Sequence, residues 1–182
     1  MAFNQGAASG NLVLIQEQTA SNSANLEFKT GITGYDQYVL MFYGVLGSAA
    51  NDQLIINFST DGGVSYDTGA NYAYTGYVNG TSLALTQQVN GGATFGELLS
   101  LIGIGTAATQ SSGQANFYNL GSSVFHKQFF CNSVGFSDAY GYINANLATN
   151  YVNTAIVNAF RISLNSGGNI VTGTFKLYGV AN

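Results

Sequence analysis

Charge is the scarcest property of this 182-residue sequence, which has four Lys and Arg residues, eight Asp and Glu residues, and no Pro or Trp. Charged residues make up 7% of the chain, whereas about 25% is typical of globular proteins. Four cations spread along the sequence cannot form the basic stripe that nucleic-acid backbones require. We therefore expect no nucleic-acid partner.

Cysteine is almost absent as well, because Cys131 is the only one. It has no second cysteine for an intramolecular disulfide, and its place after Phe129 and Phe130 predicts a buried, unreactive thiol. The 12 Tyr and 12 Phe residues argue against disorder, which requires few aromatics. The chain length predicts a single domain over residues 1–182.

Long apolar runs are also missing. The longest one, residues 38–46, is far shorter than the eighteen or more residues that a membrane-spanning helix needs, so we expect no membrane insertion. The first residues contain no basic segment before an apolar stretch, and we therefore expect no secretion signal. With these classes set aside, the pattern of apolar residues becomes the main guide to the fold.

Strand patterns recur along the whole chain. Residues 24–29 alternate apolar and polar side chains, as a half-buried strand does, and the continuously apolar residues 38–43 predict a strand covered on both sides. We expect ten short strands, at residues 11–17, 24–29, 36–47, 54–58, 71–78, 114–120, 124–136, 139–147, 158–165 and 170–180.

One region interrupts this pattern. Residues 81–89 and 95–102 are compatible with short helical turns, and residues 103–113 have the composition of a flexible loop. The sequence thus predicts an all-β protein, an antiparallel β-sandwich in the form of a jelly roll, with one long loop or short-helix insertion. The expected core consists of Leu26, Phe28, Leu54, Ile56, Phe58, Phe160, Ile162 and Leu164.

Residues 59–66 resemble a single Asp box, with Tyr66 where Trp is usual. Asp61 is expected to accept hydrogen bonds from turn amides, Gly63 to provide backbone freedom, and Tyr66 to pack under the turn. A sialidase would need several arginines to hold a carboxylate, and Arg161 is the only one. We therefore interpret these residues as a structural turn.

Residues suited to catalysis or metal binding are few. Calcium held by Asp52, Asp61 and Asp67 is an alternative to the structural turn, although the spacing is not that of an EF-hand. His126 is the only imidazole and has the pattern of an ordinary strand position. One His and one Cys are too few for a zinc site within one chain, and no spacing singles out a carboxylate pair. We expect no enzyme activity and no cofactor.

Tyrosines supply the candidate binding residues. Tyr72 and Tyr74 are expected on one side of a strand, and Tyr140 and Tyr142 repeat that spacing. Such rings can stack on sugar faces, or they can fill the core or a contact between subunits. Both interpretations stay open at the level of sequence.

The C-terminal residues 170–180, together with residues 18–24, 35–40 and 58–63, resemble segments of small virion structural proteins of tailed phages. The resemblance covers about a third of the chain and implies a non-enzymatic role at the virion surface, as a capsid decoration (cement) protein or on the tail exterior. It also implies synthesis in the host cytoplasm and contact with other virion proteins.

The nearly uncharged surface provides little repulsion between copies, so we expect a homo-oligomer and, specifically, a homotrimer. A receptor-binding module of a tail fibre or spike that contacts host surface glycan is the alternative function. A hydrolase acting on surface polysaccharide is a third, less favoured one. Binding of glycan to the four tyrosines would distinguish the second function from the first.

Overall fold

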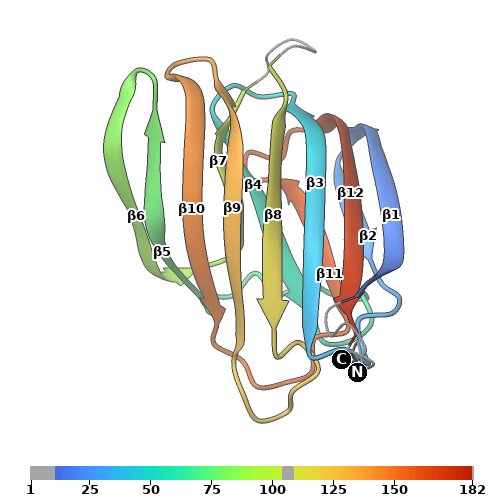
Figure 1. The fold of residues 1–182 in the computed structure, drawn as a ribbon. Coiled ribbons are helices and arrows are strands. Elements are labelled where there is room, and N and C mark those ends of the chain that lie inside the picture. Colours follow the sequence, from blue (N-terminus) through green and yellow to red (C-terminus); the bar gives the residue numbers. More distant parts are fainter. Residues whose placement is uncertain (1–10, 104–108, 182) are drawn as a thin grey trace, which may run out of the picture.

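The computed structural model describes residues 11–103 and 109–181, and Figure 1 shows their arrangement. These residues form strands, turns and loops. None of them forms a helix, and so none forms a helix that could cross a membrane. The twelve strands are β1 (Leu12–Ser23), β2 (Asn25–Phe28), β3 (Gln37–Gly47), β4 (Asp52–Ser59), β5 (Tyr72–Gly80), β6 (Leu83–Ala93), β7 (Gly96–Ile102), β8 (Ser111–Tyr118), β9 (Lys127–Ser137), β10 (Gly141–Tyr151), β11 (Ala159–Leu164) and β12 (Ile170–Val180).

The strands form two antiparallel sheets. The larger sheet has the order β1-β12-β3-β8-β9-β10-β5-β6, and the smaller sheet has the order β2-β11-β4-β7. In Figure 1 the small sheet lies behind the large one, and β7 packs against β9 and β10. The prediction of an all-β protein with antiparallel sheets is confirmed.

The prediction of one long loop or short-helix insertion is wrong, because both stretches expected to form helical turns are strands. Residues 83–93 form β6, which pairs with β5 through Thr75 and Val89 and through Tyr77 and Gln87. Residues 96–102 form β7, which pairs with β4 and buries Leu98 completely. Pairing with a distant strand satisfies the backbone and buries apolar side chains, which one or two helical turns interrupted by glycine could not do.

The loop expected at residues 103–113 ends earlier than predicted. Residues 104–108 lie outside the described part of the chain, and Ser111 already begins β8. Ser111 is buried and pairs with Val45 of β3. Backbone pairing with a central strand therefore outweighs the loop-like composition of the Ser-Ser-Gly segment.

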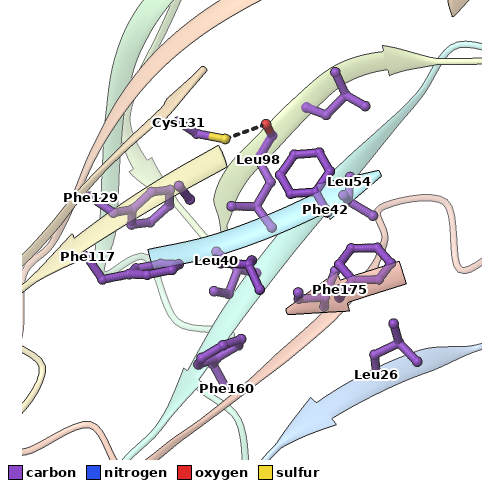
Figure 2. Close-up of a cluster of buried hydrophobic side chains, with 14 of the residues drawn as sticks. Leu26, Leu40, Phe42, Leu54, Leu98, Phe117, Phe129, Cys131, Phe160 and Phe175 are labelled. Atoms are coloured by element: carbon purple, nitrogen blue, oxygen red, sulfur yellow. Dashed lines mark hydrogen bonds between the residues drawn. The ribbon is translucent and has the colours of Figure 1, made fainter. Parts of the chain in front are cut away.

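The core lies between the two sheets and is rich in aromatic rings (Figure 2). Phe160 of β11 stacks on Phe28 with ring centroids 4.8 Å apart and on Phe117 of β8 at 5.8 Å. Burying one such side chain contributes about 1.5–3 kcal/mol. All eight residues expected in the core are buried: Leu26, Phe28, Leu54, Ile56, Phe58, Phe160, Ile162 and Leu164.

The thiol of Cys131 is part of this core, as predicted. Its Sγ donates a hydrogen bond to the carbonyl oxygen of Leu98 at 3.0 Å (Figure 2). Burial raises the pKa of Cys131 far above its usual range, so the thiolate that would act as a nucleophile is disfavoured.

Lys127, the first residue of β9, is a buried cation that joins two loops. Its Nζ donates hydrogen bonds to the carbonyl oxygens of Ser122 (2.6 Å), Phe125 (3.0 Å) and Thr154 (2.9 Å). Burial lowers the pKa of Lys127. The preceding residue, His126, is exposed and lies in the loop before β9, so its predicted strand position is wrong. β9 begins only at Lys127, because the preceding loop directs the carbonyl oxygens of Ser122 and Phe125 toward the Lys127 Nζ.

Lys127→Met should lower the free energy of unfolding by about 1–3 kcal/mol, because it removes a charged donor from three carbonyl oxygens. Urea denaturation followed by fluorescence measures the change. Lys176→Met is the matched control, since the Lys176 side chain is partly exposed and its pair with Glu17 lies at the surface. Equal stability of the two variants would contradict a structural role for Lys127.

Glu97 of β7 is a buried acid. Its Oε1 accepts hydrogen bonds from Gln53 Nε2 at 2.9 Å and from the hydroxyl of Ser100, while its Oε2 has no partner among the described residues. Burial raises the pKa of Glu97 above its ordinary value of 4.5. The folded state therefore favours the protonated form, and the stability that this form supplies is lost as pH rises through the raised pKa.

Glu97→Gln should consequently be more stable than the unsubstituted protein at pH 8, by about 1–3 kcal/mol, because the amide removes a buried charge. The advantage should shrink as pH falls toward 4.5. Denaturant titrations of both proteins at several pH values measure the difference, with the exposed Glu17→Gln as control. A pH-independent difference would show that Glu97 is not the group responsible.

Candidate functional site

The outward face of the large sheet is hollowed where β9, β10, β5 and β6 lie side by side. We call this concavity the outer hollow; it has a volume of about 790 Å³ and is lined mainly by Thr75, Tyr77, Leu85, Gln87, Phe130, Asn132, Asn146 and Ala148. In Figure 1 these four strands form the left part of the large sheet. The small sheet covers the opposite face of β9 and β10, through β7.

Strand register places the lining residues in rows. Asn132 pairs with Asn146, Asn146 with Tyr77, and Tyr77 with Gln87, so these four side chains cross the sheet in one row. The alternation of β9 sends Cys131 inward and its neighbours outward. The outer hollow is therefore a direct product of antiparallel pairing.

A second hollow of about 400 Å³ continues the first one along the strands. Both contain Thr75, Phe130 and Ala148 in their linings, and the second one extends to Val89 and Asn150. Together they form an open groove across β9, β10, β5 and β6. No residue in either lining is charged.

Two exposed rings face this groove. The side chain of Phe130 is 53% exposed and that of Tyr77 is 48% exposed, and Tyr118 contacts Phe130 edge-to-face at 6.2 Å. Asn146 Nδ2 donates a hydrogen bond to Asn144 Oδ1 at 2.9 Å, which orients the Asn146 amide. Exposed rings beside amides that donate and accept hydrogen bonds suit a ligand with apolar faces and many hydroxyls.

Tyr72 of β5, one of the four predicted binding residues, lies in the core instead. It is fully buried, its ring lies 4.8 Å from that of Tyr151, and its hydroxyl accepts a hydrogen bond from the Phe58 amide at 2.8 Å. Burial raises its pKa far above the usual range. Its ring offers no free face to a ligand, because the inward side of β5 meets the small sheet at this end.

The other three tyrosines are scattered. Tyr74 is half-buried, stacks on Phe95 at 6.3 Å and borders the second hollow. Tyr140 lies in the turn before β10, so the expectation that it shares a strand with Tyr142 is wrong. Pairing of Tyr72 with Tyr151 places Tyr72 and Tyr142 at opposite ends of the β5–β10 pair. The four residues therefore do not form one site.

Asp61 closes the turn after β4. Its Oδ1 accepts hydrogen bonds from the amides of Val64 (3.1 Å) and Ser65 (3.0 Å), and its Oδ2 accepts one from the Ser65 hydroxyl. These bonds, led by the Ser65 side chain, hold the pKa of Asp61 well below its usual range. The carboxylate is thus occupied by the turn itself.

Gly63 and Tyr66 complete this turn. Gly63 has a φ of +83°, and a Cβ there would lie 2.7 Å from Lys29 Cε and 2.9 Å from the Tyr66 hydroxyl. The Arg161 guanidinium lies 4.7 Å from the centre of the Tyr66 ring. Burial and the nearby Glu27 carboxylate raise the pKa of Tyr66 to about 12. The turn is packed against the small sheet.

The acids considered for calcium are not grouped. Asp52 begins β4 and accepts a hydrogen bond from the Ser166 amide at 3.1 Å, whereas Asp61 follows the other end of that strand. Asp67 accepts a hydrogen bond from the Tyr151 hydroxyl at 2.7 Å. Within the described residues, no three His, Cys, Asp or Glu side chains come together in a way that could hold a metal ion.

Sequence reasoning missed Phe130 and Tyr77, the two exposed rings of the groove. The signal was present in β9, where Phe130 and Asn132 alternate with Phe129 and Cys131. No family model matches the chain, and comparison with curated proteins and with solved structures gives no match either. The geometry of the groove therefore carries the functional argument.

Proposed function

We propose that this protein is a non-enzymatic recognition subunit on the exterior of a tailed-phage particle, and that the outer hollow binds neutral glycan of the host surface. The observation that carries the proposal is the exposed Phe130 ring, set among the amides of Asn132, Asn146 and Gln87. The phage location rests on the sequence resemblance. The glycan specificity rests on the chemistry of the groove.

Strand order supports a further part of the proposal, that the sandwich is an extended jelly roll. Eight strands follow the orders β1-β12-β3-β8 and β2-β11-β4-β7. The chain changes sheet at β1–β2, β2–β3, β3–β4, β4–β5, β6–β7, β7–β8, β10–β11 and β11–β12. The other four strands, β5, β6, β9 and β10, all extend the first sheet and carry the groove. Jelly rolls occur in both viral capsid and lectin domains.

Neutral sugars fit this groove better than acidic ones. A carboxylate or sulfate ligand is usually held by Arg or Lys, and the lining contains neither. A pyranose ring presents C–H groups on its faces and hydroxyls at its rim. Phe130 and Tyr77 can contact the faces while the amides exchange hydrogen bonds with the rim. The volume of about 790 Å³ lies in the range of small-molecule sites.

Phe130→Ala and Tyr77→Ala should each weaken glycan binding about tenfold or more, because a central exposed ring carries much of the contact energy. A glycan array identifies the ligand, and titration calorimetry with that oligosaccharide measures the loss. Tyr142→Ala is the matched control: its side chain is 62% exposed on the same sheet but lies outside both hollows. Binding that survives both groove substitutions would overturn the proposal.

A capsid or tail decoration protein without glycan binding is the second candidate. Exposed apolar side chains away from the groove favour it, notably Leu12 and Leu14 on β1 and Val124 and Phe125 before β9. Such side chains suit permanent contact with other virion proteins. This function would be favoured over recognition if the folded protein gives no signal on the glycan array but co-sediments with phage particles that lack this protein.

A further inference from the structure

β6 is a free edge of the large sheet and is exceptionally exposed. It ends the strand order and is hydrogen-bonded to β5 alone. Of its residues only Ala93 is buried, and the side chains of Leu85 and Val89 are 70% and 63% exposed. Every second residue of such a strand directs its N–H and C=O away from the sheet, where they can pair with another strand.

Two protective features of other edges, charge and short length, are missing from β6. β1 has a bulge between Leu14 and Gln16 and carries Glu17, which pairs with Lys176. β2 is only four residues long and carries Glu27. Between Asp67 and Glu97 the chain contains no charged residue, and it has no proline anywhere. Charges, prolines, bulges and short length are the means by which edges avoid pairing. β6 has no charge, no proline and eleven residues, and its two register shifts against β5 lie outside residues 86–90.

We propose that two copies of this protein pair through β6, antiparallel and across a two-fold axis, into one sheet with eight strands from each copy. The partner is a second copy, because β6 is uncharged and two β6 strands brought side by side therefore do not repel each other. Two-fold pairing also closes, whereas pairing of β6 with a different edge would continue into a fibre. This dimer replaces the trimer expected from the sequence, and it does not depend on glycan binding.

The apolar side chains fix the register. Leu85, Gln87 and Val89 share the outward face, because all three border the groove. If Gln87 faces Gln87 of the partner subunit, Leu85 lies opposite Val89 of the partner subunit, and the reverse contact forms across the axis. Both exposed apolar side chains of the strand are then covered, which supports this register over its neighbours.

Cysteine cross-linking tests the register directly. Gln87→Cys should form a disulfide-linked dimer under mild oxidation, because residues directly opposite in antiparallel strands lie within disulfide range, and the buried Cys131 does not compete. In Ala84→Cys, an exposed position of the same strand, the two thiols would lie about 20 Å apart, and no cross-link should form. Equal cross-linking at both positions, or at neither, would overturn the register.

Charge substitution tests the dimer itself without touching the groove. Thr86→Lys combined with Gln88→Lys brings four like charges together at the axis and should convert the dimer to a monomer in sedimentation velocity. Mixing the lysine variant with the Thr86→Glu, Gln88→Glu variant should restore a dimer that contains one lysine copy and one glutamate copy. Such a dimer would show that the lysine variant is folded and that its monomeric state is not caused by unfolding. A monomeric unsubstituted protein, or a mass unchanged by the lysines, would overturn the proposal. Glycan binding by the lysine variant is an independent readout.

Discussion

The register of the large sheet is the constraint on which the other features of the molecule depend. A shift of one residue in any strand would exchange its buried and outward side chains. In the β9–β10 pair the register places Cys131 beside Leu147 inward and Asn132 beside Asn146 outward. The same pairing therefore builds the core on one face and the groove on the other, and neither can change without the other.

The two sheets differ in width, and this difference creates the exposed surface of β5 and β6. Four strands of the small sheet face eight of the large one, with β7 against β9 and β10. β5 still buries Tyr72 and Val78, whereas β6 is exposed on nearly its whole length. A strand in this position is held by hydrogen bonds to its neighbour more than by burial, which leaves its side chains available for recognition and its outer edge available for pairing.

Local alternation was enough to predict the core but not the site. Leu26, Phe28 and Ile162 follow the period-two pattern of their own strands, and all are buried. β6 and β7 were missed because their glycines and short apolar runs resemble turns, and only pairing with β5 and β4 makes them strands. For the tyrosines, period two predicts a shared face but not which face. Tyr72 turned out to be inward because of its neighbours, which the sequence does not identify.

The scarcity of charge links the interior to the surface. Lys127 and Glu97 are buried and hold loops and strands in place, while Glu27 and Lys29 pair with each other on the small sheet. The groove and the β6 edge are left without charge. Contacts there depend on ring stacking, amide hydrogen bonds and backbone pairing, which salt screens far less than ion pairs. We propose a neutral sugar and an identical uncharged strand as the partners, because both meet such surfaces at a low desolvation cost.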